Sequence, residues 1–157
     1  MPEPEEPQAK LAITLEPLSR DECLSLLATT SLGRVAFLVD GRPEVLPVNY
    51  AVDGANVVFR TGQDTVLNKV AMQVVAFEVD QIDEMTHTGW SVVAQGVAQD
   101  VTNAIDTISE RLRGLSLVTW APGERHRWLR VNADRVTGRR LGVAPTFPDG
   151  PSETSRQ

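Results

Sequence analysis

Two Asp-Gly pairs, at 40–41 and 53–54, constrain the fold of this chain more than any other feature of its sequence. Each pair separates two segments rich in β-branched and apolar residues, and Asp-Gly supplies the positive φ angles that a tight hairpin demands. The segments 33–39, 43–52 and 56–61 are therefore predicted to form an antiparallel meander. The chain is expected to be mainly β.

Further β segments follow the meander at 74–80 and 90–101, and 126–141 is predicted to be the final strand. Gly96 is predicted to form a bulge or a sharp bend where the sheet closes. No glycine-rich dinucleotide fingerprint follows any of these segments. A six-stranded antiparallel set with short helices favours a closed or nearly closed small β-barrel over a βαβ sheet.

The helices predicted from the sequence are short. Ser19 and Glu22 have the spacing of a capping box, which predicts a helix that starts at this point and buries Cys23. The segments 65–71 and 103–112 are also compatible with short helices.

Both ends of the chain differ in composition from its middle. Residues 1–10 are rich in Pro and Glu, and residues 142–157 are rich in Pro, Ser and Thr. Neither end has the apolar content to pack against a core, so we expect disordered tails at 1–10 and 142–157 around one domain at 11–141.

Charge and composition disfavour several classes of function. The net charge of −6 disfavours a nucleic-acid partner. The arginines at 135, 139 and 140 are interpreted as solvated charges at a sheet edge or as contacts for a small anion. The sequence has no run of about 18 apolar residues and no signal peptide at its start, so we expect no membrane partner and a cytoplasmic location. We also expect no metal site, because His87 and His126 lie too far apart for a motif.

The end of the 56–61 strand and the turn after it carry groups suited to an anion. Arg60, Thr61, Thr65 and Lys69 offer charged and hydroxyl donors, whereas Asp64 lies among them with the opposite charge. Two plainer interpretations stay open for this region. Arg60 could pair with Glu78 or Asp80 on an adjacent strand, and Trp90 and Trp128 could be aromatic residues of the core or of a subunit interface.

Taken in order, six segments of the chain resemble the pyridoxamine 5′-phosphate oxidase-like superfamily of flavin-binding split barrels, in its nitroimidazole-resistance-like branch. These segments are LGRVAF (32–37), DGRPEVLPVNYAVDG (40–54), VVFRTG (57–62), VAFEVDQID (75–83), TGWSVVAQG (88–96) and RWLRVNADRVTGRRL (127–141). The resemblance implies a six-stranded antiparallel split β-barrel. It also implies a homodimer with a flavin in the cleft between its two subunits.

The resemblance assigns roles to particular residues of this chain. It implies that the phosphate of a flavin mononucleotide (FMN) meets Arg60, Thr61, Thr65 and Lys69. It places Pro47, Val48 and Asn49 beside the flavin ring. It further implies that Trp90 and Ser91 reach the cofactor from the partner subunit.

One turn departs from the family pattern. Relatives carry a Gly-Ser-Lys type sequence where this chain has Asp64-Thr65-Val66. A carboxylate close to a phosphate weakens binding unless it turns away or caps the helix, and Lys69 lies about one helical turn past the family lysine. The deazaflavin F420, haem or no cofactor therefore stand beside FMN as alternatives.

Two functions follow from these observations. The first is an FMN-dependent oxidoreductase that acts on an unknown small molecule, in which the flavin ring carries the redox chemistry. The second is a non-catalytic split-barrel dimer that has lost FMN or binds another ligand. No catalytic residue can be assigned, because Ser91 and His87 do not form a legible nucleophile and base arrangement.

Overall fold

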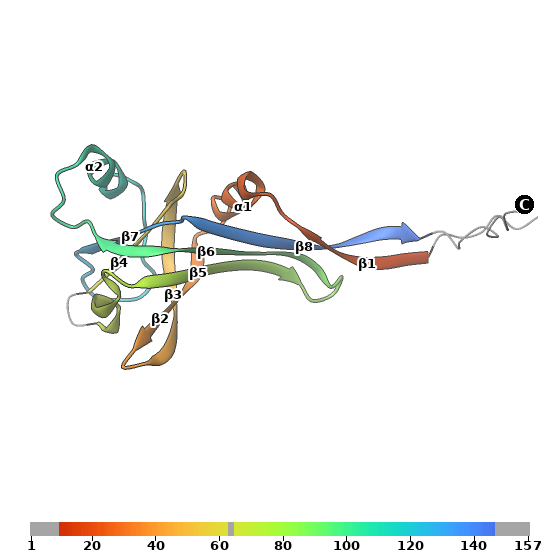
Figure 1. The fold of residues 1–157 in the computed structure, drawn as a ribbon, viewed down its shortest axis with the longest axis horizontal. Helices are drawn as coiled ribbons and strands as arrows, with labels where there is room; N and C mark the ends of the chain where they lie inside the picture. The colour runs from red at the N-terminus through yellow and green to blue at the C-terminus, as the bar shows by residue number, and fades with distance from the viewer. Residues whose placement is uncertain (1–9, 63–64, 147–157) are drawn as a thin grey trace, which may run out of the picture.

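The computed structural model describes residues 10–62 and 65–146. Figure 1 shows a β-barrel from which a two-stranded ribbon extends. In chain order the elements are β1 (Lys10–Pro17), α1 (Arg20–Leu27), β2 (Leu32–Val39), β3 (Arg42–Asp53), β4 (Asn56–Thr61), the 3₁₀ helix η1 (Val66–Val70), β5 (Val74–Asp83), β6 (Thr88–Asp100), α2 (Thr107–Arg113), β7 (Arg127–Asn132) and β8 (Arg135–Thr146).

Six of these strands form the barrel. In the order β2, β3, β4, β7, β6 and β5 each strand pairs antiparallel with the next, and β5 pairs with β2 to close the ring. The two predicted hairpins are present, with Asp40, Gly41 and Gly54 at positive φ. The predicted six-stranded antiparallel split barrel is confirmed.

β6 is the strand that closes the barrel. One edge of β6 pairs with β5, whereas the other edge pairs with β8 up to Gln95 and with β7 from Ala98 onward. Gly96 lies between these two pairings, and a Cβ at this position would lie 2.1 Å from the Asn132 carbonyl oxygen. Glycine therefore allows the close backbone approach at which β6 exchanges partners.

The prediction of one final strand over 126–141 is wrong. The chain breaks between β7 and β8, where the Ala133 amide donates to the Ala55 carbonyl at 2.9 Å and the Asp134 amide donates to the Gln95 carbonyl at 3.1 Å. β8 also continues to Thr146, past the predicted boundary at 141, because it pairs along its last residues with β1. Of the predicted tails at 1–10 and 142–157, Lys10 lies in β1 and residues 142–146 lie in β8, whereas the remaining residues lie outside the described part of the chain.

Aromatic rings fill the centre of the barrel. The Phe77 ring lies 4.8 Å from the Tyr50 ring in an edge-on contact and 6.4 Å from the Phe59 ring in a stacked one. Helix α1 packs against this core through Cys23 and Leu27, which are fully buried. The predicted capping box is present, since the Ser19 amide donates to Glu22 Oε2 and the Glu22 amide donates to Ser19 Oγ.

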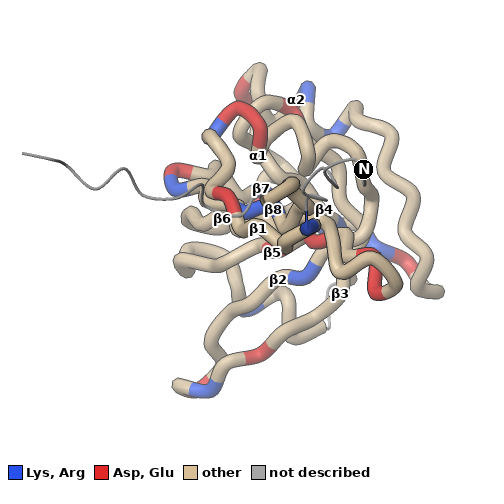
Figure 2. The backbone as a smooth tube through the Cα atoms, turned by 90° about the vertical axis from the view of Figure 1, so that its right-hand side faces the viewer, with Lys and Arg blue, Asp and Glu red and all other residues tan. Residues whose placement is uncertain are grey.

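Two further features concern the helices and the distribution of charge over the described residues. No described helix has the length and apolar character needed to cross a membrane. Figure 2 shows basic and acidic positions interspersed around the backbone.

We expect Gly96→Ala to destabilise the fold, because the added methyl group would collide with the Asn132 carbonyl oxygen. Overpacking of this kind costs about 1–3 kcal/mol, which lowers the melting temperature of a chain of this size by roughly 2–12 °C. Thermal unfolding followed by circular dichroism measures the change. Gly142→Ala is the matched control, since its Cβ would meet only the Thr14 hydroxyl oxygen, at 3.3 Å. Equal melting temperatures for Gly96→Ala and the unmodified chain would contradict the proposed role of Gly96.

Candidate functional site

A cavity of about 320 Å³ lies against β3, the end of β4 and the irregular segment 114–126. We call it the arginine pocket. It is lined by Leu46, Pro47, Val48, Asn49, Arg60, Thr65, Leu67, Thr119, Ala121 and Arg125. The structure therefore brings together five of the residues predicted from the sequence, namely Pro47, Val48, Asn49, Arg60 and Thr65.

Arg60 is held by two contacts. On β4 it lies opposite Trp128 of β7, and its guanidinium carbon lies 5.0 Å from the centre of the Trp128 ring. Its Nε donates to the Arg125 carbonyl oxygen at 2.9 Å. These contacts leave the two terminal nitrogens of the guanidinium without a hydrogen-bond partner among the described residues. Such a positioned guanidinium group is suited to contact an anion.

Among the described residues, Arg60 forms no ion pair with Glu78 or Asp80, the alternative that the sequence left open. Glu78 instead pairs with Arg34, whose Nη1 lies 3.3 Å from Glu78 Oε2. Burial raises the pKa of Glu78, the adjacent Asp80 carboxylate raises it further, and the Arg34 guanidinium acts in the opposite direction. Trp128, which is half-buried, contacts Arg60 instead of acting only as a core or interface residue.

Arg125 is a second guanidinium-bearing residue of the pocket, and the sequence did not predict it. It lies in the irregular segment before β7, where the sequence has no periodic pattern. Its nearest sequence signal is its position three residues before Trp128, the cross-strand partner of Arg60. Two arginines in one cavity favour a ligand with negative charge.

The other predicted phosphate contacts differ in their position. Thr61 is buried and its hydroxyl lies 2.5 Å from that of Thr65, which donates to the Gly62 carbonyl at 3.1 Å. Thr65 therefore lines the pocket, whereas Thr61 does not line it and contacts it only through the Thr65 hydroxyl. Lys69 is exposed and does not line the cavity. Asp64, predicted either to oppose a phosphate or to cap the helix, lies outside the described residues.

Asn49 fastens the irregular segment to the barrel. Its Oδ1 accepts a hydrogen bond from the Trp120 amide at 2.8 Å, and its Nδ2 donates to the Ser31 carbonyl at 3.2 Å. Asn49 lies in the wall of the arginine pocket, and both ends of its amide group bond to the protein.

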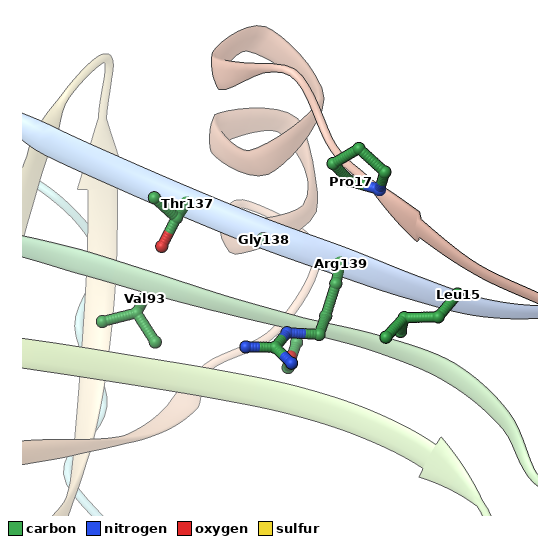
Figure 3. A pocket seen from close by; sticks show the side chains of 7 residues that line it. Leu15, Pro17, Val93, Thr137, Gly138 and Arg139 are labelled. Carbon is green, nitrogen blue, oxygen red and sulfur yellow. The ribbon is translucent and has the colours of Figure 1, made fainter.

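Trp90 and Ser91 lie away from the arginine pocket, on β6. Ser91 lines a second cavity of about 320 Å³, the outer pocket, formed by Leu15, Pro17, Ser91, Val93, Thr137, Gly138 and Arg139. Figure 3 shows Arg139 reaching from β8 across β6 in this cavity. Trp90 lines a separate, open depression with Ile82 and Asp83 of β5. Within one chain these two residues do not meet Arg60.

The sequence of the chain is similar to those of known proteins. A sequence profile of the pyridoxamine 5′-phosphate oxidase family matches residues 19–140. An uncharacterised protein of Mycobacterium tuberculosis is 40% identical over 93 residues, which cover 55% of this chain and 60% of that protein. The chain thus matches less than two thirds of the length of this curated relative.

Solved structures with the same fold include flavin-binding proteins. The FAD binding protein from Mycobacterium smegmatis is 34% identical with a TM-score of 0.67, and the match covers 80% of this chain and 96% of that chain. An FAD and haem binding protein from the same organism is 17% identical with a TM-score of 0.59, over 88% of this chain and 92% of that chain. A structure assigned to 5-nitroimidazole antibiotic resistance in Bacteroides thetaiotaomicron is 13% identical with a TM-score of 0.56, over 88% and 96%. The last two similarities concern the fold alone.

We expect Asn49→Ala to release the segment 114–126, because the Trp120 amide loses its hydrogen-bond partner, whereas the Ser31 carbonyl still accepts from the Tyr50 amide at 3.0 Å. Hydrogen exchange at the Trp120 amide should become faster by roughly 5- to 10-fold, which corresponds to about 1 kcal/mol for the lost hydrogen bond. Asn49→Asp is the matched control, since a carboxylate oxygen still accepts from the Trp120 amide. Unchanged exchange in Asn49→Ala would mean that other contacts hold the segment.

Proposed function

The chain belongs to the pyridoxamine 5′-phosphate oxidase family, as its ordered segments predict, and from this premise we propose that it is a flavin-dependent oxidoreductase. The observation that carries the proposal is the pair Arg60 and Arg125 in one cavity beside an apolar wall. We propose FMN as the cofactor, with its phosphate at these two arginines.

The residues of the arginine pocket fit the two ends of such a cofactor. Guanidinium groups are suited to a phosphate, whereas Pro47, Val48 and Leu46 offer an apolar surface for a flat ring. The volume of about 320 Å³ is at the lower end of the range for organic ligands. The cofactor would therefore extend beyond the wall that one chain supplies.

The flavin ring supplies hydride or electron transfer when it is bound. The chain contributes binding and orientation. Arg60 is held in place by Trp128 and by the Arg125 carbonyl, so little side-chain freedom is lost when an anion binds. The segment 114–126, tied down by Asn49, covers one side of the cavity and limits the access of water.

The cofactor and the activity each have an alternative. The similar structures from Mycobacterium smegmatis are of proteins that bind FAD, one of them also haem, so FAD, haem and the deazaflavin F420 are compared with FMN in the test. A non-catalytic dimer without flavin is the second candidate function. It is favoured by the exposed position of Lys69 and by Val66 at the family lysine position.

The proposal includes a homodimer, and the ribbon of β1 and β8 supports it. In Figure 1 this ribbon reaches beyond the β5–β6 hairpin, away from the barrel. Leu11, Ile13 and Leu15 lie on one face of β1, opposite Pro145, Val143 and Leu141 of β8, and the three β1 side chains are 75%, 55% and 57% exposed. The barrel of the same chain leaves this apolar face uncovered, so we propose that a second copy packs on it.

Titration of the purified chain with FMN, FAD, F420 and haem, followed by fluorescence for the flavins and by absorbance for haem, tests the cofactor proposal. Arg60→Ala should raise the Kd for FMN by about 10- to 150-fold, because a hydrogen bond to a charged group contributes about 1.5–3 kcal/mol. Arg42→Ala, at the exposed β2–β3 turn, removes the same charge elsewhere and should leave the Kd unchanged. Equal affinities for Arg60→Ala and the unmodified chain would remove Arg60 from the phosphate site. A chain that binds neither flavin would favour the second function.

Light scattering coupled to gel filtration tests the homodimer. The chain should elute with twice its mass of 17.2 kDa. Ile13→Asp should shift the mass to that of one chain, because a carboxylate in an apolar interface is strongly unfavourable. Val45→Asp is the control, since Val45 is an equally exposed valine on β3, away from the ribbon. A dimer that withstands Ile13→Asp would place the interface elsewhere.

A further inference from the structure

Another cavity, distinct from the outer pocket, adjoins the arginine pocket on the other side of Asn49. It has a volume of about 400 Å³ and is lined by Thr29, Thr30, Ser31, Leu32, Asp80, Gln81 and Trp120. We call it the acceptor pocket. The Asn49 side chain separates the two cavities, because it bonds to the Ser31 carbonyl and to the Trp120 amide, and both of those residues line the acceptor pocket.

The threonine hydroxyls of this pocket are hydrogen-bond acceptors toward a ligand. Thr29 Oγ1 donates its proton to the Leu26 carbonyl at 2.6 Å. The Tyr50 hydroxyl donates its proton to the Leu27 carbonyl at 2.6 Å, so Thr30 is the donor in its 2.5 Å contact with Tyr50. Both threonine protons are therefore used inside the protein, and only oxygen lone pairs remain.

Asp80 adds negative charge to the same cavity. It is exposed on β5, and no described residue forms an ion pair with it. The neighbouring cation Arg34 pairs with Glu78 instead. Glu78 lies two residues from Asp80 on the same face of β5, and its raised pKa reflects burial and the nearby Asp80 carboxylate. The charge of Asp80 is thus available to a ligand.

Trp120 supplies a flat surface. Its side chain is 66% exposed, although its backbone amide is fixed by Asn49. An exposed indole ring attracts flat rings and, more strongly, cations placed over its face.

We propose that the acceptor pocket binds a flat organic cation, with its ring on Trp120 and its N–H groups or positive charge toward Thr29, Thr30 and Asp80. This polarity is the opposite of that in the arginine pocket. The assignment of the cation as the substrate of the oxidoreductase rests on the proposed function, since it depends on a flavin in the adjoining cavity. The binding of the cation in the acceptor pocket does not depend on a bound flavin.

Titration with three pyridines of the same ring size tests the proposal. The probes are 1-methylnicotinamide, a cation, nicotinamide, which is neutral, and nicotinate, an anion. The chain contains 3 tryptophans, so their indole N–H signals in a ¹H–¹⁵N spectrum can be assigned by single Trp→Phe variants. We expect the Trp120 signal to shift, with the cation binding more tightly than the neutral probe and the neutral probe more tightly than the anion.

Asp80→Asn should weaken binding of the cation by about two- to fivefold, the effect of one partly exposed charge pair, and leave binding of nicotinamide unchanged. Asp83→Asn, at the exposed end of the same strand, is the matched control. Shifts confined to Trp90 or Trp128, equal affinities for cation and anion, or equal effects of the two aspartate variants would each overturn the proposal.

The same titration on Arg60→Ala separates this inference from the proposed function. Unchanged binding of the cation supports the acceptor pocket as a site of its own, and loss of binding overturns it. A chain that binds the cation but neither flavin would refute the oxidoreductase and leave the cation site standing.

Discussion

The barrel and the site both depend on one exchange of partners along β6. Before Gly96 this strand pairs with β8, and after it with β7. Because β7 is thereby placed beside β4, the contact between Arg60 and Trp128 forms across strands that are far apart in the sequence. A guanidinium held over a ring and bonded to a carbonyl loses little further freedom when an anion binds. The close backbone approach at Gly96 therefore helps to position Arg60 in the arginine pocket, because it allows the strand order that places β7 beside β4.

Local pairing explains the part of the site that the sequence predicts. The Asp-Gly hairpin at 53–54 sets Tyr50 opposite Phe59, so Pro47, Val48 and Asn49 continue β3 beside the end of β4, where Arg60 lies. The prediction for Lys69 assumes α-helical spacing after Thr65. η1 is instead a short 3₁₀ helix with about three residues per turn, and Lys69 lies on its exposed side.

Contacts between distant segments explain what the sequence does not predict. The alternation of side chains over 126–141 continues through Ala133, so the pattern gives no sign of the break that the Ala55 and Gln95 carbonyls fix. Arg125 and Trp120 lie in a segment without periodicity and are placed by hydrogen bonds to Arg60 and Asn49. Strand β1 was not among the predicted strands, although the alternation of Leu11, Ile13 and Leu15 is itself a strand signal.

The two cavities on either side of Asn49 differ little in volume, at about 320 and 400 Å³, so volume does not decide which ligand each one binds. The hydrogen-bonding groups that line them do. Guanidinium groups only donate, whereas the carboxylate and the two threonine oxygens, with their protons already used, only accept. A ligand in the wrong cavity would set donors against donors or acceptors against acceptors, which disfavours its binding there. Since Asn49 uses its donor on one residue and its acceptor on another, it can separate an anion site from a cation site without favouring either charge.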